Sequence, residues 1–235
     1  MNWCGYDWIT EERWGQLHPQ KLDWWYDGSA VSVDDDGTLH LLTHKNPKSF
    51  ETESGDEVVS PIGAGLISCT SRDFHWGTYE IEAKLPTGKE LWSAFWMWSW
   101  NTWPPEIDIM EGYSNKKASY FRWNPLGFWN AQTNVHFSDV VTGKNKSIGG
   151  KARSFTLKNP ADLFIKYRLE WTPNSLKFYY GDRLVRRVTD PIIMEQVNST
   201  EMNVVINNGV TKYLEGEDQA SDFIVKYFKY TPLGQ

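Results

Sequence analysis

PPEIDIMEG, at residues 104–112, alternates acidic with apolar residues, as does a β-strand that has one face in a core and the other in a cleft. Glu106 and Asp108 are two residues apart, so a regular strand directs both side chains to the same face. Ile107 and Ile109 then lie on the opposite face. The stretch therefore predicts a half-buried strand with an acidic face.

The third acid of this stretch, Glu111, does not fit a regular strand. It lies five residues after Glu106, so a flat strand would turn it into the core, where an unpaired carboxylate is costly. One β-bulge at Ile109 or Met110 adds a residue and returns Glu111 to the acidic face. We therefore predict a bulged strand that carries three carboxyls on one face.

Three carboxyls on one strand face repel one another and do not all ionise together. Such a group suits two-carboxylate chemistry, in which a protonated acid donates to a leaving group while an ionised one attacks. The two long Glu side chains lean inward over the shorter Asp108, towards the ~5 Å separation of a retaining glycosidase. The alternatives are an exposed acidic strand face or a cation site.

Length and composition exclude several classes of protein. The 235 residues contain no obvious linker or repeat, so we predict a single catalytic domain over residues 1–235. A net charge of -6 without a basic stripe argues against nucleic acid as a partner, and there is no apolar span of the ~20 residues needed to cross a membrane. The sequence contains 14 Trp, which suits a carbohydrate partner because indole rings stack on the apolar faces of sugars.

The two cysteines and the N-terminal sequence leave the compartment of the protein open. Cys4 and Cys69 do not define a disulfide framework, and we expect two separate buried thiols. The N-terminal sequence has neither the basic end nor the apolar stretch of a signal peptide.

Strand signals dominate the rest of the chain. Residues 78–85 alternate cleanly, and residues 176–188 predict a hairpin whose two-residue turn is Gly181-Asp182. Further predicted strands cover residues 38–43, 162–171 and 223–230, and the stretches expected to be irregular are residues 44–62, 113–132 and 207–222. Many short strands with turn signals between them predict an all-β fold of two packed sheets.

A tryptophan-rich segment precedes the acidic stretch. Trp92, Trp96, Trp98 and Trp100 share one parity, so a strand places all four indoles on one face. A strand buried on both sides accounts for part of this pattern. Trp100 and Trp103, nearest the acids and next to a loop, are the better candidates for sugar-stacking residues.

Four blocks in this order resemble glycoside hydrolase family 16: residues 74–86, 91–97, 106–111 and 171–182. The spacing of the acids is similar to that of the laminarinase-like branch, which has the bulge. The resemblance implies a jelly-roll β-sandwich of two curved antiparallel sheets with an open concave substrate cleft. It also implies endo-acting hydrolysis with retention, in which Glu106 is the nucleophile, Glu111 is the general acid/base, and Asp108 orients Glu106.

The same resemblance suggests residues around the acids. Trp103 matches the family residue that floors the subsite before the scissile bond, and His136 matches one expected near the acid/base. Asp222 and Gly37 match the ligands of a structural calcium, and no cofactor is implied for catalysis. The chain departs from the family pattern at Pro104-Pro105, which leaves few residues between Trp103 and Glu106, and at residues 206–209, on the far side of the cleft.

The leading hypothesis is a monomeric, extracellular enzyme that hydrolyses β-1,3- or mixed β-1,3/1,4-glucan. One alternative keeps the chemistry but acts on a red-algal galactan (agarose, porphyran or carrageenan), for which Arg122, Lys116 and Lys117 would supply cations. A second alternative is a non-catalytic, lectin-like module, although all three acids are present. Transglycosylation is a third, because water and an acceptor sugar compete for the same intermediate.

Overall fold

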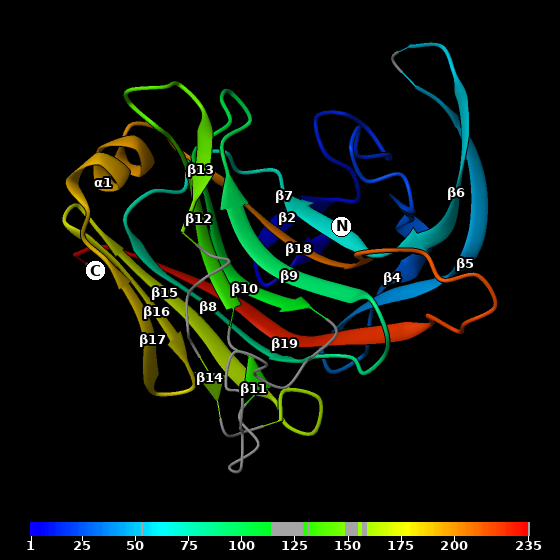
Figure 1. The fold of residues 1–235 in the computed structure, drawn as a ribbon. Helices are drawn as coiled ribbons and strands as arrows, with labels where there is room; N and C mark the ends of the chain where they lie inside the picture. Colours follow the sequence, from blue (N-terminus) through cyan, green and yellow to red (C-terminus); the bar gives the residue numbers. More distant parts are fainter. Residues whose placement is uncertain (53, 114–128, 131, 149–154, 157–158, 235) are drawn as a thin grey trace, which may run out of the picture.

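The computed structural model describes residues 1–52, 54–113, 129–130, 132–148, 155–156 and 159–234. Within this part of the chain, two large sheets pack face to face (Figure 1). The first has eight strands in the order β1 (Asn2–Trp3), β2 (Tyr6–Ile9), β7 (Leu66–Cys69), β18 (Asn203–Val210), β9 (Leu91–Trp98), β10 (Glu106–Tyr113), β12 (Gln132–Ser138) and β13 (Asn145–Ser147). The expected all-β jelly roll is confirmed.

The second sheet has nine strands and packs against the first through a shared core. Their order is β17 (Arg183–Val188), β16 (Ser175–Tyr180), β15 (Ile165–Thr172), β8 (Gly77–Lys84), β19 (Ser221–Pro232), β5 (Leu39–Glu51), β6 (Glu57–Ala64) and β3 (Trp24–Tyr26), with β4 (Val31–Val33) paired to β5. A separate pair joins β11 (Trp129–Asn130) to β14 (Phe155–Thr156). Neighbouring strands of both large sheets run antiparallel, except that β3 and β6 are parallel.

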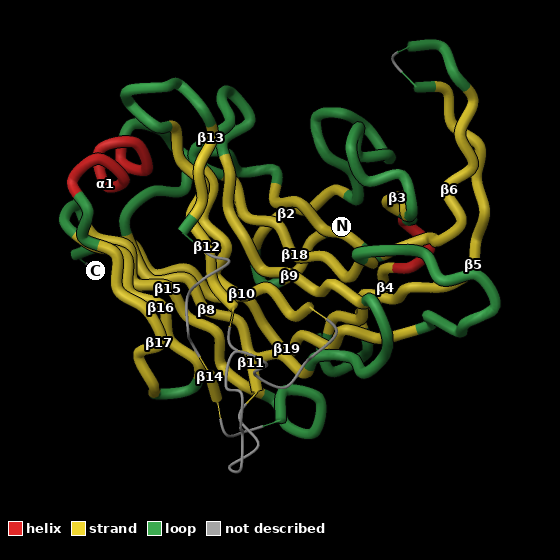
Figure 2. The backbone as a smooth tube through the Cα atoms, viewed as in Figure 1, coloured by secondary structure: helices red, strands yellow, loops and turns green. Residues whose placement is uncertain are grey.

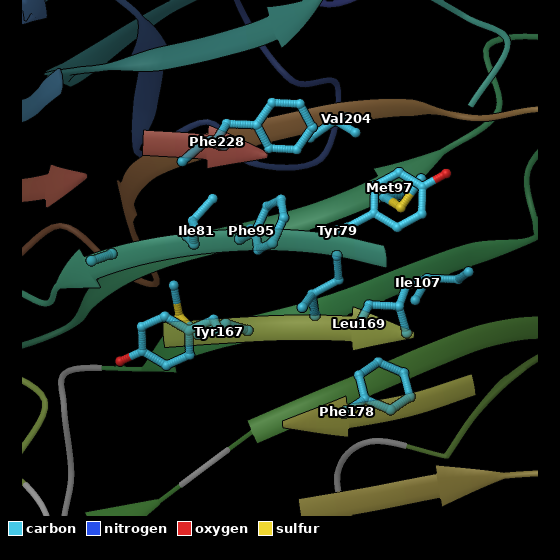
Figure 3. Close-up of a cluster of buried hydrophobic side chains, with 14 of the residues drawn as sticks. Tyr79, Ile81, Phe95, Met97, Ile107, Tyr167, Leu169, Phe178, Val204 and Phe228 are labelled. Carbon is cyan, nitrogen blue, oxygen red and sulfur yellow. The ribbon is translucent and has the colours of Figure 1, made fainter. Parts of the chain in front are cut away.

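The main core lies between the two sheets and follows from the alternation of each strand. On β8, Tyr79 and Ile81 are buried while the residues between them are half-buried. Phe95 and Met97 of β9 enter the same core from the other sheet (Figure 3). Alternate residues of each strand point into this core. The residues between them on the eight-stranded sheet point to its other side and form the concave face.

A second apolar cluster lies on that concave face. Val204 and Ile206 of β18 belong to the main core, whereas Val205, between them, belongs to the second cluster together with Trp98. Trp24, the first residue of β3, also belongs to this cluster. The sheet is therefore buried on both sides over part of its width.

The predicted hairpin over residues 176–188 is confirmed. Tyr180 pairs with Arg183, and Gly181 takes a φ of 58°, a left-handed conformation that glycine adopts without strain. The strand predicted over residues 162–171 begins later, at Ile165, because Asp162 lies in a turn that Asn159 holds by a hydrogen bond.

Residues 44–62 are wrongly predicted as irregular. They form most of a long β5–β6 hairpin that extends beyond the rest of the molecule (Figure 1). Apolar alternation ends at Thr43, and the following β5 residues are half-buried or exposed, so no apolar signal marks the strand. The stretch 207–222 is also partly regular, because β18 continues to Val210 and β19 begins at Ser221.

Helical structure is limited in the described chain (Figure 2). The helix α1 (Pro191–Asn198) begins after Asp190, whose carboxylate accepts hydrogen bonds from two backbone N–H groups of the first turn. Short one-turn helix η1 (Gly28–Ala30) precedes β4. Among the described residues, no helix has the length and apolarity needed to span a membrane.

Cys4 and Cys69 are both free, and only Cys69 is buried. The expectation that Cys4 is buried is wrong, because it lies in the exposed turn between β1 and β2.

Candidate active site

Strand β10 carries the predicted bulge. On one side Asp108 pairs with Trp96 and Met110 pairs with Phe95, so Ile109 is the extra residue. On the other side the register also shifts between Asp108 and Glu111. Ile109 and Met110 are both buried in the main core.

The bulge brings the three acids to one cavity of about 440 Å³ on the concave face. Glu106, Asp108 and Glu111 all line it. Strands of the eight-stranded sheet contribute Trp92, Ala94, Trp96 and Trp98 from β9, Asn134 and His136 from β12, Asn207 from β18 and Leu66 from β7. The rest of the lining comes from β3 (Trp24 and Tyr26), from the segment between β2 and β3 (Arg13, Trp14, His18, Pro19, Gln20 and Lys21) and from Trp103 in the loop before β10. Acids thus lie beside a wall of indole rings, which suits a carbohydrate.

A hydrogen-bond donor and an imidazole lie beside the carboxyl group of Glu106. The indole N–H of Trp103 donates to its Oε2 at 2.9 Å, and the Nε2 atom of His136 lies 3.4 Å from its Oε1. His136 Nε2 is also 3.4 Å from Asp108 Oδ2 and 3.0 Å from the amide nitrogen of Asn134. These groups hold His136 between the two acids.

The electrostatics of the cluster favour a shared proton. Burial and then the charge of Asp108 raise the pKa of Glu106 to about 8, while His136 and the Trp103 N–H lower it. Burial and then Glu111 raise the pKa of Asp108 well above its ordinary value, and its contact with Glu106 lowers it. Within the described residues, Asp108 Oδ2 has no hydrogen-bond partner of good geometry.

Asp108 is therefore the acid that is best placed to keep its proton. Once Asp108 is neutral, its repulsion of Glu106 is removed, and the Trp103 N–H stabilises a negative charge there. The arrangement leaves an anionic Glu106 beside a neutral Asp108, with Glu111 two ladder positions further along the same face.

Of the other predicted binding residues, some lie at the cavity and others do not. Trp103 is 44% exposed at the rim of the cavity, with its ring 5.9 Å from that of His136. Trp100 does not line the cavity: the Arg72 guanidinium lies 3.9 Å above its ring. Arg122 lies outside the described residues, as do Lys116 and Lys117.

His136 lies beside Glu106 and Asp108, not beside the proposed acid/base as expected. The antiparallel register explains this difference, since it pairs His136 with Glu106 and Gln132 with Glu111.

The predicted calcium ligands have protein partners. Asp222 Oδ2 lies 2.8 Å from His40 Nδ1, and the other ring nitrogen of His40 lies 3.0 Å from Asp34. The Gly37 carbonyl accepts the indole N–H of Trp3 at 2.8 Å. Calcium takes oxygen ligands, so a site with an imidazole between two carboxylates fits it poorly. The calcium remains a prediction from the resemblance alone.

Several cavity residues have no sequence signal that marks them. Arg13, Trp14, His18 and Lys21 lie in an irregular segment far from the acids in sequence. Asn207 lies in the stretch 206–209 that departs from the family pattern, and its Oδ1 accepts the indole N–H of Trp96 at 2.8 Å. A search for polar residues of the cleft-facing parity on β12 and β18 would have found Asn134 and Asn207.

Comparisons with known proteins match the chain to one family. The family model "Glycosyl hydrolases family 16" matches residues 18–224. A glucan endo-1,3-beta-glucosidase from Cryptopygus antarcticus is 32% identical over 197 residues, which cover 76% of this chain and 67% of that protein. A beta-1,3-glucan-binding protein from Penaeus monodon is 28% identical over 154 residues, covering 59% of this chain and 38% of that protein.

Solved structures share the fold. One, from a study of endo-acting O-glycanases of the human gut microbiota that initiate mucin breakdown, has a TM-score of 0.75 and 22% identity, and covers 97% of this chain and 85% of that one. The chain spans only 38% of the length of two of its curated relatives.

Proposed function

The chain belongs to glycosyl hydrolase family 16, and we propose that it is a retaining endo-glycosidase that cleaves β-1,3- or mixed β-1,3/1,4-glucan. The name of the Cryptopygus relative, a glucan endo-1,3-beta-glucosidase, supports this choice of substrate. Because such a polymer is met outside the cell, we also expect the protein to act there.

The observation that carries the proposal is the position of Glu111. The bulge at Ile109 turns it to the face that bears Glu106 and Asp108, so all three acids line a cavity walled by indole rings. Two carboxyls that flank one bond are the requirement for glycoside hydrolysis with an acid and a nucleophile.

In the first step, Glu111 protonates the glycosidic oxygen while Glu106 Oε attacks the anomeric carbon and the leaving sugar departs. Asp108, which keeps its proton, stabilises the carboxylate of Glu106 before attack. In the second step, the carboxylate of Glu111 takes a proton from water, and the resulting hydroxide displaces Glu106. Two inversions produce net retention at the anomeric carbon.

The central test compares Glu106→Gln and Glu111→Gln with the unchanged protein on laminarin and lichenan, with release of reducing ends as the readout. We expect each variant to lose at least about a thousandfold in kcat and to keep its melting temperature within a few degrees. Glu195→Gln, on the exposed side of α1, is the matched control and should retain full activity. Turnover near the unchanged level in either active-site variant would refute the assignment.

The stereochemistry is tested by proton NMR of the newly formed reducing end. The β-anomer should accumulate first, and early accumulation of the α-anomer would exclude a covalent intermediate on Glu106. Products longer than the substrate in the same samples would show that transglycosylation competes with hydrolysis.

A second candidate substrate is an anionic galactan. Arg13 and Lys21 line the same cavity as the acids, and their positive charges would favour sulfate groups. Incubation with laminarin, lichenan, agarose, porphyran and carrageenan separates the two candidates. Sugar release from a sulfated galactan alone would favour the second, and binding to any of them without release would favour a lectin-like module.

A further inference from the structure

Residues 10–26, here called the crossing segment, pass over the concave face of the eight-stranded sheet. The segment begins after β2, which pairs with β7 of that sheet, and ends with β3, which pairs with β6 of the other sheet. Its residues 13, 14, 18–21, 24 and 26 line the active-site cavity. Because these residues share the cavity with the three acids, the segment lies over the concave face near them.

Trp14 fixes the segment against the floor of the cleft. Its ring centroid lies 4.9 Å from that of Trp98, and its indole N–H donates to the Tyr26 hydroxyl at 3.2 Å. Trp98 pairs directly with Glu106 in the β-ladder and points to the same face, yet it is only 1% exposed. An indole beside the proposed nucleophile is thus covered by the chain itself.

Neighbouring residues extend this cover. Arg13 Nη1 donates to the backbone oxygen of Trp100 at 2.7 Å, and its guanidinium lies 5.0 Å from the Trp98 ring. Further along, Trp24 packs so closely on Gly209 of β18 that a Cβ there would lie 2.7 Å from the indole. The crossing segment therefore lies directly on β9 and β18.

This position limits the space for substrate on one side of the acids. Adjacent strands lie ~4.8 Å apart, so the covered parts of β9 and β18 are only ~5 and ~10 Å from β10, which leaves room for about one or two sugar rings between the acids and the crossing segment. The cavity volume of about 440 Å³ is consistent with such a short site.

We propose that the crossing segment is an end wall that sets how many sugars bind on the β18 side of the cleft, with Trp14 as the residue that determines this length. The inference rests on the proposed glycosidase function and specifies its substrate range. The wall blocks a long glycan from continuing across Trp98, so the fragment held on this side is short and of fixed length.

Trp14→Leu tests the proposal, because the smaller side chain uncovers the Trp98 ring as an extra stacking surface. The measurement is kcat/KM for a ladder of β-1,3-glucan oligosaccharides prepared from laminarin, of increasing length. In the unchanged protein, kcat/KM should stop rising once the short site is full. In Trp14→Leu it should rise about two- to tenfold further with one additional sugar, since stacking on an indole contributes to that extent.

Trp76→Leu is the matched control. Trp76 is a partly exposed indole whose N–H donates to Asn198, away from the cavity. Its length profile should equal that of the unchanged protein, and melting curves of all three proteins confirm that they are folded. An unchanged profile in a folded Trp14→Leu protein overturns the proposal.

Calorimetric binding of the same ladder provides a readout that needs no turnover. If the unchanged protein hydrolyses none of the oligosaccharides, the proposed function fails. The end wall is then tested by binding alone: Trp14→Leu should bind the longer oligosaccharides two- to tenfold more tightly than the unchanged protein does. If neither protein binds any member of the ladder, the end wall is refuted as well.

Discussion

Glu12, at the start of the crossing segment, provides a sharp test of how this face is packed. Its side chain is only 2% exposed, and within the described residues neither carboxyl oxygen has a hydrogen-bond partner of good geometry. Burial raises the pKa of Glu12 from its ordinary value of 4.5 to about 7. The Ser68 hydroxyl, the Arg72 guanidinium and the indole N–H groups of Trp98 and Trp100 lower it, but by less.

The perturbation is Glu12→Gln, which replaces the acid by a neutral side chain of nearly the same shape. In the folded wild type the carboxyl keeps its proton up to a pH of about 7, whereas in the unfolded chain it ionises near pH 4.5. The protonated Glu12 carboxyl therefore makes its full contribution to the free energy of unfolding below pH 4.5, and this contribution is lost as the pH rises from 4.5 to about 7. Above that range the wild type is destabilised by about 3 kcal/mol relative to a neutral side chain.

The assay is thermal unfolding followed by circular dichroism at pH 4.5 and pH 8, at one ionic strength. Relative to wild type, Glu12→Gln should gain about 3 kcal/mol between the two pH values, which corresponds to a shift of roughly 6–12 °C in Tm for a domain of this size. The raised pKa of Glu106 also lowers stability as the pH rises, but it is common to both proteins and cancels in the comparison.

The exposed neighbour Glu11 offers the matched control. Glu11→Gln should change Tm by the same small amount at both pH values. A Tm difference between Glu12→Gln and wild type that is constant from pH 4.5 to pH 8 would show that Glu12 is hydrated or paired in solution, and the packing of the crossing segment would have to be reconsidered.

Three further predictions concern the strand, the site and the helix. Trp103→Phe removes the N–H that donates to Glu106, and kcat/KM should fall about tenfold or more on the substrate found to be cleaved; an unchanged value would exclude a role for that hydrogen bond. Deletion of Ile109 removes the bulge, so the ladder becomes regular and all three acids stay on one face. This variant should stay folded and detectably active, although the loss of a buried Ile should lower its unfolding free energy by about 2–5 kcal/mol. Insertion of Ala after Ile109 should abolish activity. Asn198→Ala leaves the buried Trp171 N–H without its acceptor, and urea unfolding should show a loss of about 1–3 kcal/mol, with no loss if water replaces the amide.

Much of the fold could be predicted because strand alternation is a local property. Tyr79 and Ile81 are buried, as their parity indicates, and the Gly181-Asp182 turn joins the strands that flank it. The long β5–β6 hairpin could not be predicted in this way. Beyond Thr43 every β5 side chain is half-buried or exposed, so the backbone pairing with β6, and no apolar alternation, defines this part as a strand.

The candidate site was only partly predictable for a related reason. Parity and the cost of a buried carboxylate were enough to predict the bulge, and with it the common face of Glu106, Asp108 and Glu111. The partners of these acids depend on register: His136 lies opposite Glu106 because of how β10 and β12 align, which no local pattern specifies.

The amino-acid sequence by itself determined the all-β class, the acidic strand face and the extra residue within it, because each of these follows from the two-residue period of a strand and the cost of burying charge. Only the tertiary structure decided that Trp14 covers Trp98, that Glu12 is buried and that Asn134 and Asn207 join the cavity. These contacts bring together residues from strands and loops that are distant in sequence, and their geometry is set by strand order, register and the path of the crossing segment between the two sheets.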